Sequence, residues 1–317
     1  HIDTISKEKP MKGKFKDQLF TADGKPRAKV SLKRLQTLWF NTGTLCNIQC
    51  KNCYIESSPF NDRLAYLTNK DLHTYLDAID KLEQVAEEIG FTGGEPFLNP
   101  EIISLLSDSL AANYRVLVLT NGMKPMLNHK TQLLDLKDNY GSSLRFRVSI
   151  DHYSQCLHDL ERGKNSWERM LKGLVWLNAN GFTLTIAGRT AWNESDVELR
   201  LGYQKLFDKY NIDIDASDSS ALILFPEMDL GIDVPEITTD CWDSLGIKPS
   251  LMMCAESRMV VKRKNSKHPT VVACTLIPHE EAFDLGQDLE VALNRSIYLN
   301  HRHCAKFCVL GGGQCSI

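Results

Sequence analysis

The chain has 317 residues, of which 43% are hydrophobic, and this is enough for one large core or for a core with a small appendage. Its 37 basic and 40 acidic residues give a net charge of -3, which argues against a protein that binds nucleic acid through bulk positive charge. No apolar run approaches membrane-spanning length and no signal-peptide pattern opens the sequence, so the ten cysteines predict metal or redox centres in a reducing cytoplasm.

The first 34 residues are rich in lysine and arginine, and Gly24 and Pro26 interrupt any periodic pattern. This composition predicts a basic N-terminal arm over residues 1–34, a solvated extension rather than a docking segment for an acidic partner. Residues 35–40 then predict a first strand, which ends at a polar turn over residues 41–44.

Three cysteines, Cys46, Cys50 and Cys53, follow this strand within one short loop. Thiolates are the usual ligands of iron-sulfur clusters, and three of them leave the fourth iron of a four-iron, four-sulfur (4Fe-4S) cluster open to a small molecule. A zinc site remains an alternative, although zinc sites usually show paired C-x2-C units with two further ligands at a distance. A disulfide framework is typical of small secreted chains and does not fit this length.

Strands and helices alternate from here to residue 226, and further strands are expected to end near residues 91, 119, 150, 186 and 225. Thr68 and Asp71 resemble a capping pair at the start of the first helix, and Ser166 is expected to cap the helix that Gly181 stops. Six such units predict an α/β fold in which residues 35–226 form a partial (β/α)6 TIM barrel. A doubly wound open sheet is the alternative, but no G-x-G-x-x-G turn follows the first strand.

Glycines and polar residues gather at the C-terminal ends of the predicted strands, where barrel enzymes carry their chemistry. In chain order these residues are Gly93, Gly94, Glu95, Asn121, Ser149, Asp151 and Arg189. Because the strand ends meet at one edge of a parallel sheet, we expect them to form one site together with the cysteine loop.

The cysteine loop and the glycine turn one βα unit later together resemble the radical S-adenosylmethionine (SAM) superfamily, whose members carry a CxxxCxxC loop after the first barrel strand and a GGE-type turn after the second. The resemblance implies that Cys46, Cys50 and Cys53 hold three irons of a 4Fe-4S cluster and that the amino and carboxylate groups of SAM chelate the fourth. It also implies that Glu95 accepts hydrogen bonds from the SAM amino group, with Gly93 and Gly94 freeing the backbone around it.

The sequences S-I-D at 149–151 and H-D-L-E-R at 158–162 resemble the SxD and HDxxR segments of members with cluster-bearing C-terminal extensions. In those proteins the serine and the arginine hold the SAM carboxylate or ribose, which implies these roles for Ser149 and Arg162, with Arg189 as a second candidate. An ordinary helix-surface salt bridge is the alternative for Arg162. Many members carry an aromatic residue directly before the third cysteine, where this chain has Asn52, with Tyr54 after the cysteine.

The βα rhythm stops beyond residue 226, and residues 227–317 are expected to form a cysteine-rich extension built on a β-hairpin. Cys254 and Cys274 lie near the outer ends of the hairpin, and Cys304, Cys308 and Cys315 follow. This pattern resembles the shortened SPASM, or twitch, extension that binds one auxiliary 4Fe-4S cluster, and it implies that the first four of these thiols are the ligands, with Cys315 as a substitute. A zinc knuckle that includes His301 or His303 is the alternative.

We therefore expect an enzyme that reductively cleaves SAM to a 5'-deoxyadenosyl radical and abstracts hydrogen from a peptide or a small molecule, with an auxiliary cluster assisting oxidation or substrate binding. A radical cyclase or methylating enzyme acting on a small metabolite is the second hypothesis. A non-catalytic iron-sulfur redox protein is the third, and it would need the thiols without Glu95, Ser149 and Arg162 at the strand ends. The expected partners are a reductant such as flavodoxin or ferredoxin and the substrate, with no membrane and no nucleic acid.

Overall fold

The computed structural model describes residues 13–82, 86–227, 229 and 231–313. An eight-stranded sheet lies at its centre, in the order β7-β6-β5-β4-β3-β2-β8-β9, and a separate pair joins β1 and β10. The strands are β1 (Lys29–Val30), β2 (Thr37–Asn41), β3 (Glu88–Thr92), β4 (Arg115–Thr120), β5 (Leu144–Ser149), β6 (Thr183–Arg189), β7 (Leu222–Phe225), β8 (Ser257–Val261), β9 (Thr270–Val272) and β10 (Ile297–Tyr298).

Strands β2 to β7 lie side by side in the order in which the chain forms them, and every neighbouring pair is parallel. A doubly wound sheet instead reverses its strand order at a switch point. The uninterrupted order therefore excludes the open-sheet alternative and confirms the predicted partial barrel. All five residues of β2 are buried, as expected for a parallel strand that is covered on both faces.

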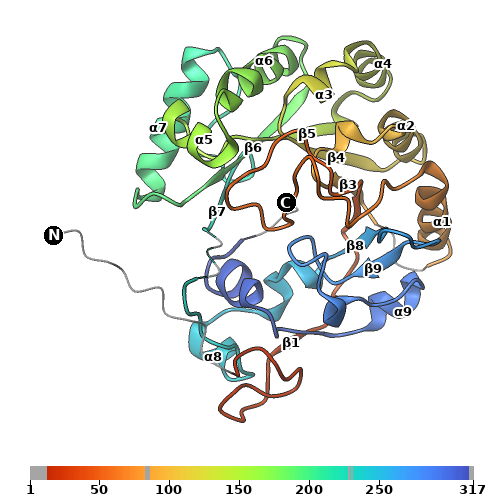
Figure 1. Cartoon of the computed structure of the whole chain (residues 1–317), viewed down its shortest axis with the longest axis vertical. Helices are drawn as coiled ribbons and strands as arrows, with labels where there is room; N and C mark the ends of the chain where they lie inside the picture. The colour runs from red at the N-terminus through yellow and green to blue at the C-terminus, as the bar shows by residue number, and fades with distance from the viewer. Residues whose placement is uncertain (1–12, 83–85, 228, 230, 314–317) are drawn as a thin grey trace.

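Helices connect the parallel strands and form an arc outside them (Figure 1). They are α1 (Asn69–Asp80), α2 (Ile102–Ala111), α3 (Lys124–Leu127), α4 (Lys130–Tyr140), α5 (Gln155–Arg162), α6 (Ser166–Ala179) and α7 (Asp196–Lys209). Two short helices, α8 (Cys241–Leu245) and α9 (Leu289–Asn294), follow β7 in the chain and lie outside this arc. The predicted pair of Thr68 and Asp71 forms a complete capping box at the start of α1. No helix in the described ranges combines the length and the apolar character needed to cross a bilayer.

The predicted cap at Ser166 is wrong, because the N-cap position of α6 is Asn165, in a left-handed conformation. The orphan groups at this helix start are satisfied by Asp159 of α5, whose carboxylate accepts bonds from the Ser166 hydroxyl (2.9 Å) and the Trp167 backbone N–H (2.8 Å). This contact ties α5 (Gln155–Arg162) to the start of α6.

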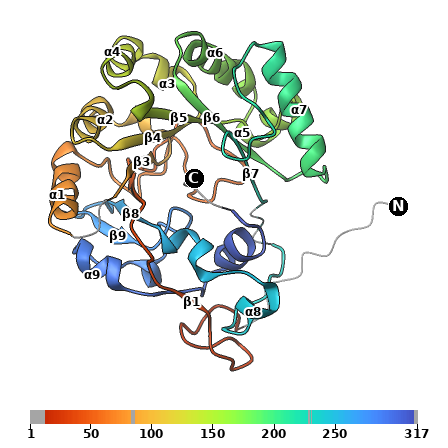
Figure 2. The same cartoon turned by 180° about the vertical axis from the view of Figure 1, so that it is seen from behind.

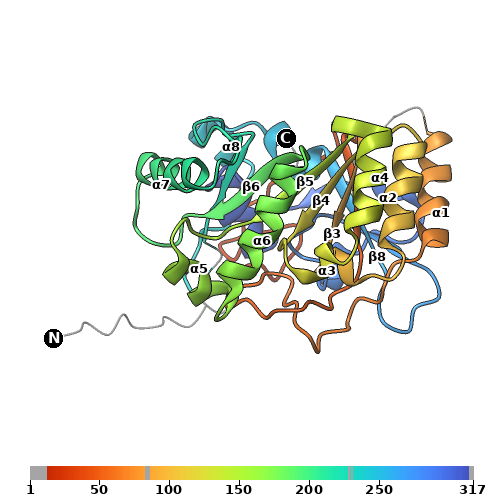
Figure 3. The same cartoon turned by 90° about the horizontal axis from the view of Figure 1, so that it is seen from above.

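The C-terminal ends of the barrel strands face one side of the molecule. In Figure 3 the loop that follows β2, coloured red to orange, lies at the same end as α3 and α5, the short helices after β4 and β5. The cysteine loop therefore lies at the edge where we expected the site.

The predicted hairpin of the extension is confirmed by the antiparallel pair β8 and β9. Its first strand also pairs in parallel with β2, so the extension continues the barrel sheet beyond its first strand. Figure 2 shows the blue C-terminal elements beside β8 and β9, across from the arc of helices α2, α4 and α6. Sequence patterns predict the hairpin but not this long-range pairing, because nothing in β8 encodes which strand lies beside it.

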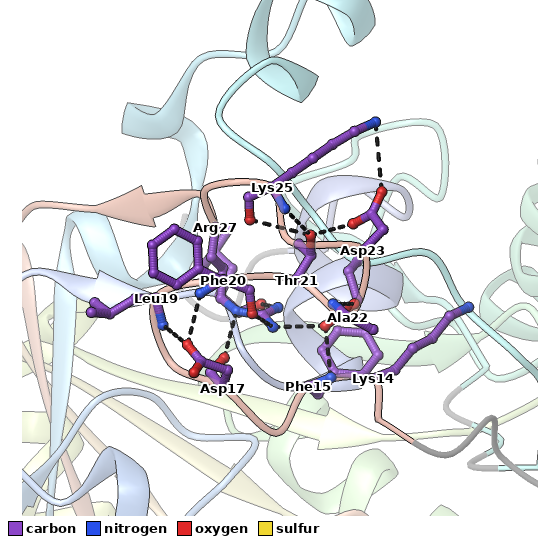
Figure 4. Close-up of polar contacts among 12 residues, drawn as sticks. Lys14, Phe15, Asp17, Leu19, Phe20, Thr21, Ala22, Asp23, Lys25 and Arg27 are labelled. Carbon is purple, nitrogen blue, oxygen red and sulfur yellow. Dashed lines mark hydrogen bonds and ion pairs between the residues drawn. The ribbon is translucent and has the colours of Figure 1, made fainter.

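The N-terminal segment packs against the C-terminal part of the chain (Figure 4). Arg27 is buried, and its guanidinium pairs with Glu236 (2.6 Å) and donates to the carbonyl of Phe20 (2.8 Å). Ala28 and Val30 are fully buried, and β1 pairs with β10. The expectation of a solvated arm is wrong for these residues, because a high content of lysine and arginine does not show which of these side chains find a buried partner.

Candidate active site and metal centres

A cavity of about 800 Å³, counted with its open mouth, collects most of the predicted cofactor residues at the strand ends. Its lining includes Cys46, Cys50, Cys53, Gly93, Gly94, Asn121, Ser149, Arg162 and Arg189. These residues come from the loop after β2, from the ends of β3, β4, β5 and β6, and from α5. The fold thus brings one local motif and several distant side chains to a single concave site.

The two glycines allow the turn after β3 to pack directly on the cysteine loop. Gly93 has φ +150°, and a Cβ on Gly94 would lie 2.1 Å from the carbonyl oxygen of Leu45. The backbone N–H of Gly94 donates to the Gly43 carbonyl (2.8 Å), and the N–H of Glu95 donates to the Leu45 carbonyl (3.1 Å). The start of the cysteine loop is therefore held by backbone bonds that any side chain at Gly94 would obstruct.

Glu95 is buried behind the cavity wall and is not among the residues that line it. Its carboxylate accepts bonds from the Thr120 hydroxyl (2.8 Å) and from the backbone N–H groups of Asn121 (2.8 Å) and Phe97 (3.2 Å). Burial raises the pKa of Glu95 to about 7, against the opposing effect of these bonds. The carboxylate thus joins the ends of β3 and β4, and its expected hydrogen bond to the SAM amino group stays a prediction.

Asn121 connects β4 to the first cysteine. Its side-chain amide donates to Asn47 (2.8 Å) and lies 3.9 Å from the Cys46 sulfur. Burial raises the pKa of Cys46 to about 12, with a smaller contribution from the negative charge of Glu95. A thiol with such a pKa becomes a thiolate when a metal replaces its proton, and the neighbouring amide can then stabilise the sulfur charge.

Asp151 does not line the cavity but holds the two arginines that do. Its Oδ1 accepts a bond from Nη2 of Arg162 (3.0 Å) and lies 3.6 Å from Nε of Arg189. Burial opposes ionisation of Asp151, but the charges of Arg162 and Arg189 keep its pKa below the usual value. Because only 12% of the Arg162 side chain is exposed, the alternative of a helix-surface salt bridge is wrong. The Arg162 Nε is buried and has no hydrogen-bond partner among the described residues.

The aromatic residue of the cavity comes from the position after the third cysteine. Tyr54 lines the cavity, and the Arg189 guanidinium lies 5.8 Å from the centre of its ring. Asn52 instead binds the carboxylate of Glu161 through its side-chain amide (3.1 Å), and its backbone carbonyl accepts a bond from Arg189 (3.2 Å). Asn52 stands where many family members carry an aromatic residue, but Tyr54, on the other side of the third cysteine, still places an aromatic ring in the cavity.

A second cavity, of about 380 Å³, lies within the extension and contains four of the predicted thiols. Its lining includes Cys254, Cys274, Cys304, Cys308 and His303, together with apolar side chains such as Met253 and Ile297. Cys315 lies outside the described residues. His301 does not line this cavity, but its ring packs on that of His303, with the centroids 4.6 Å apart.

Each set of thiols lines a single cavity, as the cysteine ligands of one iron-sulfur cluster must. Within the described part of the chain, no three Cys, His, Asp or Glu side chains are already placed as the ligands of a single metal ion.

Ser57 and Thr275 are among the residues of the first cavity that sequence reasoning missed. The Ser57 hydroxyl is buried and has no partner among the described residues. Thr275 belongs to the extension and directly follows Cys274, so neighbouring residues contribute to the two cavities. No sequence signal could identify Thr275, because its role depends on how the extension packs against the barrel.

Fold and site together define a partial-barrel protein of the iron-sulfur class. Residues 40–201, slightly more than half of the chain, match the model of the Radical SAM superfamily, and the chain belongs to this superfamily. Proteins of this superfamily use a 4Fe-4S cluster and SAM, as the sequence motifs imply.

Curated relatives match only part of this chain. A GTP 3',8-cyclase of Microcystis aeruginosa is 29% identical over 167 residues, which are 48% of this chain and 47% of that protein. The subtilosin biosynthesis protein AlbA of Bacillus subtilis is 29% identical over 143 residues, 45% of this chain and 30% of that protein. The chain thus spans less than half the length of these relatives.

Solved structures confirm the fold. Streptococcus suis SuiB bound to S-adenosylmethionine has a TM-score of 0.61 at 12% identity, covering 84% of this chain and 67% of that one. The anSMEcpe structure with bound AdoMet has a TM-score of 0.58 at 15% identity, covering 82% of this chain and 78% of that one.

Proposed function

We propose that this chain cleaves SAM reductively and uses the resulting radical to abstract a hydrogen atom from a peptide. The observation that carries the proposal is the shared cavity of Cys46, Cys50 and Cys53 with Ser149 and Arg162 at the strand ends. A simple electron carrier needs the thiols but has no use for a buried arginine and a serine beside them. We therefore prefer the enzyme over the redox protein.

The residues around the cysteine loop suit the groups of SAM. The Arg162 fork would bind the SAM carboxylate, and the Ser149 hydroxyl would bind the carboxylate or the ribose. The ring of Tyr54 offers an apolar face to the adenine. Gly93 and Gly94 keep the wall thin enough for the cofactor to approach the backbone, while Glu95, Asn121 and Asp151 hold the lining residues in place.

The cluster and SAM supply the chemistry, since one electron cleaves the sulfonium bond to methionine and a 5'-deoxyadenosyl radical. The protein positions the cofactor against its substrate and excludes water from the cavity.

An auxiliary 4Fe-4S cluster held by Cys254, Cys274, Cys304 and Cys308 fits the second cavity. Its wall is mostly apolar, and four thiols give a complete ligand set without an open iron. We propose that this cluster assists substrate oxidation or binding, because the adjacent Thr275 lines the first cavity. If the extension binds zinc instead, metal analysis should find one zinc per chain. If an alanine variant of one of these four cysteines retains the cluster, Cys315 replaces that cysteine as a ligand.

A peptide substrate is supported by the relatives. AlbA is named for the biosynthesis of a bacteriocin, MftC is a maturase, and SuiB has been solved with the precursor peptide SuiA. A small metabolite is the second candidate, because several matching relatives are GTP 3',8-cyclases. Entry of deuterium into 5'-deoxyadenosine from labelled peptides or labelled nucleotides distinguishes the two.

The proposed activity is tested by incubating the reconstituted protein anaerobically with SAM and dithionite. We expect release of 5'-deoxyadenosine and more than four irons per chain. The Cys46→Ala variant should release none, while the C46A/C50A/C53A triple variant should retain the auxiliary iron. The activity proposal fails if the wild-type protein releases no more 5'-deoxyadenosine than Cys46→Ala, and the auxiliary cluster fails if the triple variant holds no iron.

We also propose a reductant, a cellular location and a division of the chain into units. We propose flavodoxin or ferredoxin as the reductant, because the reaction needs a single electron at low potential. A reducing, cytoplasmic location would suit ten cysteines of which the nine described ones form no disulfide. We also propose that residues 35–226 form the catalytic unit and residues 227–317 the auxiliary unit, with residues 1–34 as an N-terminal segment.

A further inference from the structure

Arg258 on β8 is fully buried, with 0% exposure, and lies four residues after Cys254. Its guanidinium binds only backbone carbonyls. Nη1 donates to Cys254 (2.5 Å) and Ser257 (2.9 Å), Nη2 to Arg295 (3.1 Å), and Nε contacts Ala292 (3.4 Å). The hydrogen-bonding capacity of the side chain is therefore largely used, but its positive charge is not neutralised by these groups.

Another buried arginine, Arg27, has the carboxylate partner that a buried positive charge usually has. Arg27 is equally inaccessible, at 2% exposure, and pairs with the carboxylate of Glu236 at 2.6 Å. Among the described residues, no carboxylate forms such a pair with Arg258. An arginine does not lose its proton in a protein, and burying an unpaired ion is costly, so a negative charge is expected nearby.

The groups that can supply this charge line the second cavity. Burial lowers the pKa of Arg258, and the thiolates of Cys254 and Cys274 are the groups that raise it again. Both cysteines line the cavity with Cys304 and Cys308, and Cys254 also gives its carbonyl to the guanidinium. Four thiolates around an iron-sulfur cluster carry a net negative charge, so a ligated cluster would complete the pair.

We propose that Arg258 is the buried counter-cation of the auxiliary cluster, and that it raises the reduction potential of that cluster. This inference rests on the proposed cluster in the second cavity. One-electron reduction makes the cluster more negative, so a fixed cation beside its ligands favours the reduced form. Arg258 is a positioning and charge-balancing residue, since it contacts the backbone of a ligand and not the reacting atoms.

The potential of the auxiliary cluster tests this role. In the C46A/C50A/C53A background only the auxiliary cluster remains, and a potentiometric titration followed by electron paramagnetic resonance reports its midpoint. We expect Arg258→Gln to lower the equilibrium constant for reduction about tenfold, a shift of about 59 mV to more negative potential for one electron. Arg258→Lys, which keeps the charge, should stay near the parent value.

A control arginine lies two residues beyond the end of β8. Arg263 pairs with Asp284 (3.1 Å), so Arg263→Gln removes an equal charge that already has a partner and should leave the potential unchanged. If Arg258→Gln titrates at the parent potential, or if Arg258→Lys shifts as far as Arg258→Gln, the charge-balancing role is wrong. If the parent variant holds no iron, the auxiliary cluster itself is wrong and the inference falls with it.

Thermal unfolding gives a second readout if Arg258→Gln loads iron poorly. In the wild-type apo protein the charge of Arg258 lacks its counter-ion, whereas in the loaded protein it is balanced. Arg258→Met should therefore lower the midpoint temperature of the loaded protein more than that of the apo protein. An equal decrease in both forms would show that the side chain only satisfies the four carbonyls, and would overturn the inference.

Discussion

Asp151→Asn tests whether one buried carboxylate organises the cofactor site. Asp151 is 2% exposed and faces Arg162 at 3.0 Å and Arg189 at 3.6 Å. At an effective dielectric constant of about 20, each pair corresponds to roughly 5 kcal/mol of direct attraction, most of which desolvation offsets. Removing one member of a buried pair costs about 3–5 kcal/mol, because the remaining charge is left unpaired.

The amide of asparagine keeps one acceptor for Arg162, so we expect a decrease of about 3 kcal/mol in the free energy of unfolding. Without the carboxylate the two arginines repel each other and lose their fixed orientation. Loss of such a supporting group typically weakens a site by about 10–100-fold, and we expect the Kd for SAM to rise by this factor. Equilibrium dialysis with reconstituted protein measures the Kd, and urea unfolding measures the stability.

Asp159→Asn is the matched control, because this carboxylate caps α6 and binds neither arginine. It should cost about 1 kcal/mol of stability and leave the Kd for SAM unchanged. The reasoning is refuted if Asp151→Asn binds SAM as tightly as the wild type, or if both variants weaken SAM binding equally. In either case Arg162 does not hold the cofactor through Asp151.

Three further changes have defined outcomes. Gly94→Ala places a Cβ 2.1 Å from the Leu45 carbonyl oxygen, and we expect it to cost about 1–3 kcal/mol and to lower the iron retained after reconstitution, measured per chain. Glu95 has a folded pKa of about 7, above its ordinary value of 4.5, so its contribution to stability is present below about pH 4.5 and is lost as the pH rises to about 7. The apo wild type should lose about 3 kcal/mol relative to Glu95→Gln over this range, and parallel pH profiles of the two proteins would contradict the assignment. Tyr54→Leu should raise the Kd for SAM about tenfold if the ring stacks on adenine, and an unchanged Kd would place the adenine elsewhere.

Local patterns were sufficient to predict the barrel and the loop of three cysteines. Each strand of the barrel is a short buried run that ends at a turn, and the capping box of Thr68 and Asp71 involves residues three apart, so both signals lie within one stretch of chain. The thiols of Cys46, Cys50 and Cys53 share one loop for the same reason. Helix caps supplied from a neighbouring helix, as Asp159 supplies one to α6, have no such local signal.

Residues whose side chains turn away from the cavity could not be separated from those that face it. Glu95 and Asp151 stand at strand ends like Asn121 and Ser149, yet their carboxylates bind protein donors behind the wall. The alternation of side chains along a strand predicts which face of the sheet each residue occupies, but the turns after β3 and β5 break this alternation. Only the packed structure shows which of these side chains line the cavity.

The order of strands and helices, the loop of three cysteines and the cysteine-rich hairpin could be predicted from the amino-acid sequence, because each depends on residues close together in the chain. Long-range packing alone places β8 beside β2, brings Thr275 to the first cavity and buries Arg258 beside Cys254 without a carboxylate partner among the described residues. Such relations join residues far apart in the chain or depend on burial, and both are set by the packing of the whole domain. Charge balance in particular is a property of the folded interior, where each buried ion must find its partner in space.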